Sequence, residues 1–148
     1  MTTTRWALEV ERLHKRFGDL EVVKGVSLQA AEGDVISIIG SSGSGKSTFL
    51  RCINMLEMPD QGVVRVDGEE IRLKPARSGG MEPADPRQLD RIRARLGMVF
   101  QSFNLWPHLT VLENVTEAPV HVLGRPRDEA ADTARRLLEK VGIGDKTG

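Results

Sequence analysis

Apolar and polar residues near the N-terminus follow the two-residue period of a β-strand. Leu8 and Val10 alternate with charged residues, which is typical of a strand with one buried and one exposed face. A turn is indicated at Gly18-Asp19, and further strands are expected over residues 26–30 and 62–66. We therefore predict that the first part of the chain forms strands joined by turns.

Residues 35–39 (Val-Ile-Ser-Ile-Ile) have a different pattern, because they are mostly apolar and β-branched. A strand of this composition is usually buried on both faces, as in a parallel sheet covered by helices. A turn signal over residues 32–34 precedes the segment, and a glycine-rich stretch follows it. We predict a buried strand here, and a shorter strand at residues 98–100 (Met-Val-Phe).

The remaining pattern predicts helices at residues 47–56, 87–96, about 110–118 and 126–141. The third begins with T-x-x-E, the capping box that satisfies two backbone donors, and Pro119 is expected to limit it. Gly142 is a natural C-terminal cap for the fourth. The apolar face of that last helix is expected at Ala131, Ala134, Leu138 and Val141. Residues 74–86 contain three prolines and two glycines, and predict an exposed loop.

The glycine-rich stretch is Gly40-Ser41-Ser42-Gly43-Ser44-Gly45-Lys46-Ser47, which matches the P-loop pattern G-x-x-x-x-G-K-[ST] in full. Such a loop aims backbone N–H groups at phosphate oxygens, and the following helix adds partial positive charge. Lys46 is expected to reach the β- and γ-phosphates, the Ser47 hydroxyl to coordinate Mg²⁺, and Thr48 to contact phosphate. A chance match is disfavoured because the motif lies between a strand and a helix. We therefore predict a site for ATP with Mg²⁺.

Composition excludes several other classes. The chain has 21 Lys plus Arg and 21 Asp plus Glu, and zero net charge argues against a dedicated nucleic-acid binder. The most apolar run, residues 35–40, is too short to span a bilayer, so no direct membrane insertion is expected. The single cysteine, Cys52, fits a reducing cytoplasm and is expected to be a small buried residue.

A basic stripe on the second predicted helix is formed by Arg87, Arg91 and Arg95. We interpret it as a solvated helix face, with anion binding as the alternative. The three histidines are scattered along the chain, and their spacing indicates no metal site.

Two stretches carry a family resemblance, namely residues 35–54 around the P-loop and residues 98–115 (Met98-Val99-Phe100-Gln101 onward). Both resemble the ATP-binding cassette (ABC) transporter ATPases, in particular the polar amino-acid uptake group typified by the histidine permease ATPase. The loop at residues 74–86 also resembles an insertion found in importers of basic amino acids. The resemblance runs along nearly the whole chain.

The resemblance implies an α/β fold, the N-terminal part of an ABC-type P-loop NTPase. Residues 1–148 would form a partial nucleotide-binding domain, with an antiparallel β subdomain and an incomplete RecA-like core. Within it, residues 40–48 would be the P-loop, residues 98–107 the Q-loop region, and residues 110–148 the start of the helical subdomain. The C-terminal half of such a domain would be absent.

The resemblance also implies roles for two residues outside the P-loop. Phe17 lies where the family places an aromatic ring that stacks on adenine; the usual residue is Tyr, and Phe keeps the π-face without the hydroxyl. Gln101 corresponds to the Q-loop glutamine, which contacts Mg²⁺ and water. The implied ATP-binding residues are Phe17, Gly40, Ser41, Ser42, Gly43, Ser44, Gly45, Lys46, Ser47, Thr48 and Gln101. The implied Mg²⁺ ligands are Ser47 and Gln101.

Partners follow from the same resemblance. The segment from Ser102 to Asn114 resembles the surface that docks a membrane subunit's coupling helix, with Phe103, Leu105 and Trp106 as apolar anchors. The intact parent would form a head-to-tail ATPase dimer below two membrane-spanning permease subunits. It would therefore be cytoplasmic, and peripheral on the inner face of the plasma membrane.

Three family motifs that follow this region do not occur in the sequence: the Leu-Ser-Gly-Gly-Gln signature, the acidic strand with its catalytic glutamate, and the switch histidine. Hydrolysis requires a held triphosphate, a fixed metal and an oriented water. We therefore expect weak nucleotide binding with little or no hydrolysis. We interpret the chain as a truncated ATPase subunit of an importer for polar, and on the resemblance basic, amino acids. The alternatives are a non-enzymatic nucleotide-binding remnant and a small P-loop kinase, which the Phe100-Gln101 context disfavours.

Overall fold

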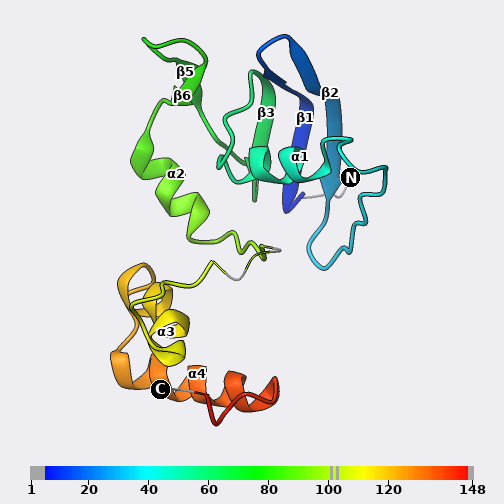
Figure 1. The fold of residues 1–148 in the computed structure, drawn as a ribbon. Coiled ribbons are helices and arrows are strands. Elements are labelled where there is room, and N and C mark those ends of the chain that lie inside the picture. Colours follow the sequence, from blue (N-terminus) through cyan, green and yellow to red (C-terminus); the bar gives the residue numbers. More distant parts are fainter. Residues whose placement is uncertain (1–5, 101, 103, 147–148) are drawn as a thin grey trace, which may run out of the picture. The chain divides into compact units, whose positions relative to one another are not determined.

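The computed structural model describes residues 6–100, 102 and 104–146. The chain forms two compact units, Met1–Leu96 and Gly97–Gly148. The first contains the six described strands and helices α1 and α2, and the second contains helices α3 and α4 (Figure 1). No helix within the described part of the chain is long and apolar enough to cross a membrane.

A four-stranded antiparallel sheet is the framework of the first unit. Its strands are β1 (Leu8–Phe17), β2 (Leu20–Ala30), β3 (Gln61–Val66) and β4 (Glu69–Glu70), in the order β2-β1-β3-β4. β1 is hydrogen-bonded on both sides, with Leu8 opposite Ala30 on one side and Val66 on the other. The turn at Gly18 is confirmed, and β2 starts earlier than the predicted residue 26 because its whole length pairs with β1.

Helix α1 (Lys46–Ile53) packs on this sheet and closes the hydrophobic core. It contributes Phe49 and Cys52, and helix α2 (Pro86–Arg93) adds Leu89 and Ile92. Figure 1 shows α1 lying across the sheet. Cys52 is fully buried, and burial raises the pKa of its thiol to about 11, so it is a core residue as expected.

The buried strand predicted at residues 35–39 does not form. These residues lie outside any strand, and Val35 and Ile39 are 94% and 90% exposed. The strand predicted at residues 98–100 is also absent, and Val99 is 98% exposed. A strand needs a hydrogen-bonded neighbour, and no described segment pairs with either stretch. Composition alone therefore predicted both strands wrongly for this chain.

The loop expected over residues 74–86 contains structure. β5 (Leu73–Pro75) and β6 (Met81–Pro83) form a two-stranded hairpin, and Lys74 lies 3.4 Å from Glu82 across it. Both glycines at the tip have positive φ, 91° at Gly79 and 77° at Gly80, which glycine adopts without steric cost. The turn signals were identified correctly, but the short strands between them were not.

Two packed helices make up the second unit. They are α3 (Val111–His121) and α4 (Arg127–Lys140). The capping box of α3 is confirmed, since Thr110 and Glu113 bond reciprocally at 3.2 and 2.8 Å. α3 continues past the predicted end at Pro119, because proline in the last turn removes only one helical hydrogen bond.

The C-terminal cap of α4 is also confirmed. Gly142 has φ 79°, and its N–H donates to the Glu139 carbonyl while the Ile143 N–H donates to that of Leu138. The buried face of α4 is Ala130, Ala134 and Leu138 rather than the predicted set. Val141 is 69% exposed, since the helix ends one residue before it.

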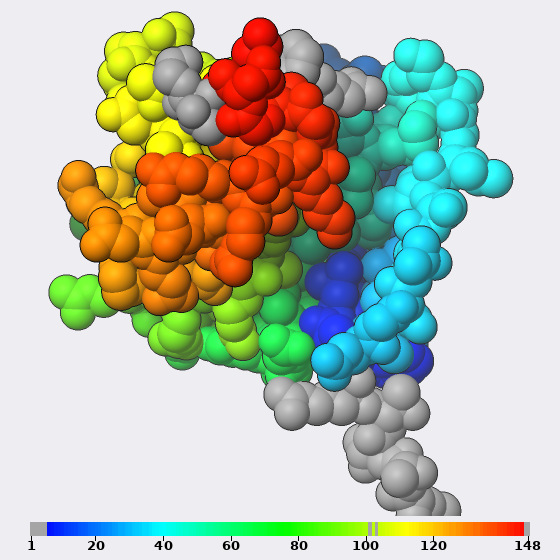
Figure 2. Space-filling model, turned by 90° about the horizontal axis from the view of Figure 1, so that it is seen from below, coloured from blue at the N-terminus to red at the C-terminus, as the bar shows by residue number. Residues whose placement is uncertain are grey.

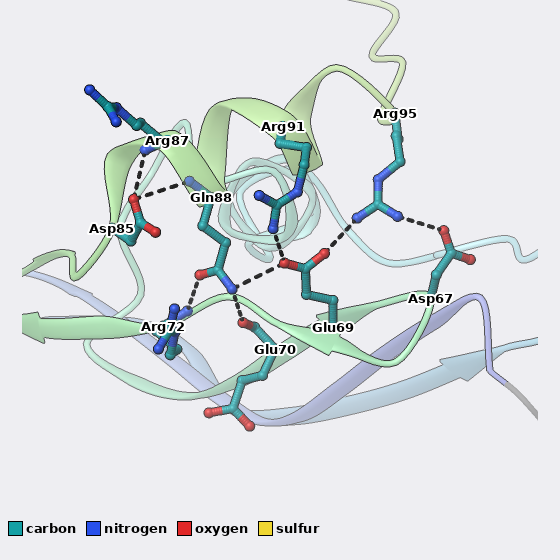
Figure 3. A network of polar contacts seen from close by, with 9 residues as sticks. All are labelled: Asp67, Glu69, Glu70, Arg72, Asp85, Arg87, Gln88, Arg91 and Arg95. Carbon is teal, nitrogen blue, oxygen red and sulfur yellow. Dashed lines mark hydrogen bonds and ion pairs between the residues drawn. The ribbon is translucent and has the colours of Figure 1, made fainter.

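A polar network attaches α2 to the edge of the sheet (Figure 3). Glu69 pairs with Arg91 and, at 3.1 Å, with Arg95, which also reaches Asp67 at 3.3 Å. Gln88 is buried, and its amide donates to the Glu69 carboxylate and the Glu70 carbonyl, both at 3.2 Å. Two of the three arginines in the basic stripe are therefore ion-paired across to β4, and the stripe is only partly a solvated face.

This network predicts a pH-dependent contribution to stability. The hydrogen bond from Arg91, followed by that from Gln88, holds the pKa of Glu69 below its ordinary value of 4.5. The folded state therefore binds a proton at Glu69 less readily than the unfolded chain does. The stabilising contribution of this carboxylate is complete above its ordinary pKa of 4.5 and is lost as pH falls through the lowered pKa.

We expect Glu69→Gln to destabilise the first unit at neutral pH and to differ less from the unmodified chain in acid. Urea unfolding across the acidic range measures this difference, and Glu32→Gln, at an exposed turn, is the control. A deficit that stays constant down to low pH would show that the charge of Glu69 is not the cause.

Candidate functional site

The P-loop makes a tight turn directly against β2. Gly43 and Gly45 have φ of 78° and 90°, a region that other residues rarely adopt. At Gly45 an added Cβ would lie 2.7 Å from the Val22 carbonyl oxygen. Glycine is thus required at Gly45 both for its dihedral angle and for the close approach of the loop to β2.

The N-terminus of α1 opens onto this loop. Its N-cap is Gly45, and no side chain caps the first turn. The first N–H groups of a helix have no intrahelical acceptor, and the helix dipole concentrates positive charge there. Backbone geometry therefore suits an anion, and a phosphate group would satisfy these donors.

The Lys46 ammonium lies against its own loop. Its Nζ donates to the carbonyls of Gly40 at 2.9 Å and Ser41 at 2.7 Å, with the Ser44 hydroxyl at 3.4 Å. All three acceptors are neutral, whereas a phosphate oxygen would form a stronger, charge-assisted hydrogen bond. Lys46 is accordingly placed to exchange loop carbonyls for phosphate.

Two cavities border the loop. The smaller, about 160 Å³, is lined by residues 43–48 and Val22, so it contains the helix N-terminus with Ser47 and Thr48. The larger, about 620 Å³, is lined by apolar side chains of β2, by Phe49, by residues 36–39 and by the P-loop residues Gly40, Ser41, Ser44, Gly45 and Lys46. The smaller cavity contains the Ser47 and Thr48 side chains and the first N–H groups of α1, which are the kinds of donor that suit a phosphate group.

The donor set also fits Mg²⁺ as a partner of bound phosphate. The Ser47 side chain is exposed in the smaller cavity, and its hydroxyl is the kind of hard oxygen ligand that Mg²⁺ prefers. Mg²⁺ commonly takes one or two protein ligands and completes its shell with phosphate oxygens and water. Among the described residues, no group of three or more His, Cys, Asp or Glu is arranged to hold a metal ion.

Phe17 lies at the end of β1, beside the turn at Gly18. Its side chain is 46% exposed, so part of the ring is free to stack on a planar group. The Lys15 ammonium lies over the ring, 5.0 Å from its centroid. Sequence reasoning did not identify Lys15, although two residues apart on a strand share one face, which is the signal that would have found it.

The predicted Q-loop residue Gln101 lies outside the described residues, as does Phe103. Phe17 and the P-loop both belong to the first unit. The structure thus places the predicted residues 40–48 in the loop before α1 and in the first turn of α1, and Phe17 on the same unit. The pairing of Ser47 with Gln101 at one metal stays a prediction.

The expected docking segment is held by one side chain, Asn114. The Trp106 N–H donates to its Oδ1 at 2.7 Å, and its Nδ2 donates to the carbonyls of Trp106, Leu109 and Thr110 at 3.1, 3.1 and 2.9 Å. Leu105 and Trp106 are each 57% exposed. The loop before α3 therefore presents two large apolar side chains on a hydrogen-bonded backbone.

Three relatives match this chain in sequence over nearly its whole length. Histidine transport ATP-binding protein HisP of Pseudomonas aeruginosa is 62% identical over 141 residues, covering 95% of this chain and 55% of the relative. Arginine/ornithine transport ATP-binding protein AotP of the same species is 62% identical over 138 residues, covering 93% and 54%. The HisP of Escherichia coli is 60% identical over 139 residues, covering 94% and 54%. The chain spans about half the length of these curated relatives.

A solved structure and a family profile also match this chain. CbiO1 from Clostridium perfringens, part of the ABC transporter complex cbiONQ, superposes with a TM-score of 0.72 at 25% identity, over 97% of this chain and 53% of that one. The expected ABC-type ATPase fold is thus confirmed. The profile described as ABC transporter matches residues 23–148, which include the P-loop and both helices of the second unit. The chain belongs to the ABC transporter family.

Proposed function

We propose that this chain is the ATP-binding part of an importer ATPase for polar amino acids, and that residues 40–48 hold the triphosphate of Mg-ATP. The observation that carries the proposal is the P-loop itself, in which an uncapped helix N-terminus and the Lys46 ammonium converge on one loop. The amino-acid transport names of relatives at about 60% identity support the transport role.

In this proposal, each part of the site has a separate task. Backbone N–H groups of the loop and of α1 hold the phosphates, Lys46 neutralises the β- and γ-phosphates, and Ser47 ligates Mg²⁺. The adenine stacks on Phe17, and Gln101 is the further Mg²⁺ ligand that the family resemblance implies. Mg²⁺ would supply charge neutralisation at the phosphate oxygens.

Substrate and partners follow from the relatives. Their names specify histidine, arginine, ornithine, lysine, nopaline and octopine, which share polar and mostly basic chemistry. We propose polar amino acids as the transported class, with basic amino acids as the first substrates to test. The permease subunits would dock on the segment from Ser102 to Asn114, and the intact protein would act as a head-to-tail dimer on the cytoplasmic face of the membrane.

Hydrolysis requires groups that residues 1–148 do not contain. The sequence has the parts that hold a triphosphate but no signature motif and no acidic pair following an apolar strand to orient water. We therefore propose that the 148-residue chain binds Mg-ATP without competent hydrolysis. The domain division proposed from the family is a P-loop at residues 40–48, a Q-loop region at 98–107 and the start of a helical subdomain at 110–148.

The first prediction concerns nucleotide affinity. Lys46→Ala removes a charge-assisted phosphate contact, so the affinity for Mg-ATP should fall by roughly 10- to 100-fold, as expected for a hydrogen bond to a charged group. Isothermal titration calorimetry measures the change, and Lys24→Ala, an exposed lysine on β2, is the matched control. Equal affinities for Lys46→Ala and the unmodified chain would exclude phosphate binding by this loop.

The second prediction concerns turnover. The purified chain should bind Mg-ATP and release phosphate no faster than Lys46→Ala does, because residues 1–148 contain no acidic pair after an apolar strand that would orient the attacking water. A phosphate-release assay, run with and without small phosphate acceptors, tests this. Rapid hydrolysis that Lys46→Ala abolishes would contradict the proposal, and acceptor-dependent ADP formation would favour a kinase.

The third prediction concerns the docking segment. Asn114→Ala removes the acceptor of the Trp106 N–H and three further hydrogen bonds, so amide exchange at Trp106 should accelerate by about 5-fold or more. Hydrogen-exchange mass spectrometry of the loop before α3 measures this, with Glu117→Ala on the same helix as the control. Unchanged exchange would mean that Asn114 does not order the proposed permease-binding loop.

A further inference from the structure

The Lys15 side chain lies between two parts of the first unit that are distant in sequence. It is only 13% exposed, and its Nζ donates to the Met58 carbonyl at 2.8 Å and lies 3.8 Å from the Glu57 carboxylate. The same ammonium lies over the Phe17 ring. Three different groups therefore surround a single, largely buried positive charge.

These three groups explain why the largely buried ammonium of Lys15 is tolerated. A buried ammonium needs hydrogen-bond or ionic partners, and the carbonyl and the carboxylate supply them on one side. The π-face of Phe17 supplies an electrostatic partner on another side, since a cation is attracted to the negative face of an aromatic ring. The ring is thereby held by an interaction that a neutral side chain would not provide.

The junction around Lys15 is tied down by backbone contacts as well. The Arg16 N–H donates to the Asp60 carboxylate at 2.6 Å, and the Asp60 N–H donates to the His14 carbonyl at 2.9 Å. Residues 57–60 follow α1, the helix that begins at the P-loop. The end of β1 is thus connected to the segment that leads out of the phosphate-binding helix.

We propose that Lys15 is a positioning residue for the base of the nucleotide. Its ammonium occupies one face of Phe17 and fixes the ring, so a planar base stacks on the remaining exposed face. The inference rests on the proposed function, because it takes Phe17 as the adenine-stacking residue. Lys15 itself contacts no part of the nucleotide, and it acts by preorganising the ring.

A purely structural role makes a different prediction. If Lys15 only fills the space next to the core, its removal would weaken every ligand of the site equally, through a less stable fold. If it positions Phe17, its removal would weaken only ligands that carry a base. Mg-ATP and inorganic triphosphate with Mg²⁺ share the phosphate contacts and differ in the base, so the ratio of their affinities isolates the effect.

The experiment uses the 148-residue chain and calorimetric titration with both ligands. Lys15→Met should lower the affinity for Mg-ATP by about 3- to 10-fold, in the range of a partly desolvated cation–π contact, and leave that for triphosphate unchanged. Lys15→Gln keeps a donor for the Met58 carbonyl without the charge and should give the same result. Lys24→Met is the matched control and should change neither affinity.

A double-mutant comparison tests whether Lys15 acts through the Phe17 ring. Phe17→Leu removes the π-face, so adding Lys15→Met to it should cause no further change in the ratio. Thermal unfolding of each variant identifies any that fails to fold, in which case Lys15→Gln replaces Lys15→Met.

Equal losses for the two ligands would overturn the positioning role, and so would an effect of Lys15 that persists without Phe17. If the unmodified chain binds neither ligand, the proposed nucleotide site itself fails, and the role of Lys15 fails with it. Retained ATP binding with an unchanged ratio in both Lys15 variants would remove the inference alone.

Discussion

The contact between Gly45 and β2 is the constraint on which the site depends. Because a Cβ at Gly45 would lie 2.7 Å from the Val22 carbonyl oxygen, only glycine lets the loop lie this close to the sheet. Helix α1 starts at the next residue, so this contact also fixes where its unpaired N–H groups begin. Phe49 and Cys52 then bury the helix against the strands and hold that position. The helix end that we propose to bind phosphate is in this way fixed by the hydrophobic core.

β1 lies between the parts of the first unit that we propose to bind phosphate and base. It pairs with β2 and β3 on its two edges, and Val10 and Leu13 place it in the core. Its last residues carry Lys15 and Phe17, and Lys15 reaches the carbonyl of Met58 in the segment after α1. The network of Glu69 with Arg91 and Arg95 serves α2 in a comparable way, by fixing a helix to the sheet edge through charge rather than through apolar contacts alone (Figure 3).

Two apolar segments stay exposed for a physical reason. Residues 35–39 and 98–100 have strand composition, but a strand buried on both faces gains its stability from neighbouring strands and from helices that cover it. The first stretch lies beside the P-loop, and its side chains line the larger cavity with those of β2. Figure 2 shows the segment that precedes α1, in light blue to cyan, at the surface of the molecule. The chain spans about half of its relatives' length, and these residues have no described strand partner in it.

The sequence by itself determined the features that depend on local chemistry. The P-loop, the capping box at Thr110, the glycine cap at Gly142 and the turn at Gly18 each need particular residues at fixed spacing, and each lies where the pattern placed it. Tertiary structure alone decided which strands form, because pairing depends on partners that a local pattern does not contain. It also decided the hydrogen-bond partners of Lys15 and Asn114. The carbonyl that accepts from Lys15 lies 43 residues away along the chain. The carbonyls that accept from Asn114 lie 4 to 8 residues away. Hydrogen bonds between a side chain and a backbone carbonyl carry no residue-specific signal at the acceptor, so only the folded chain reveals them.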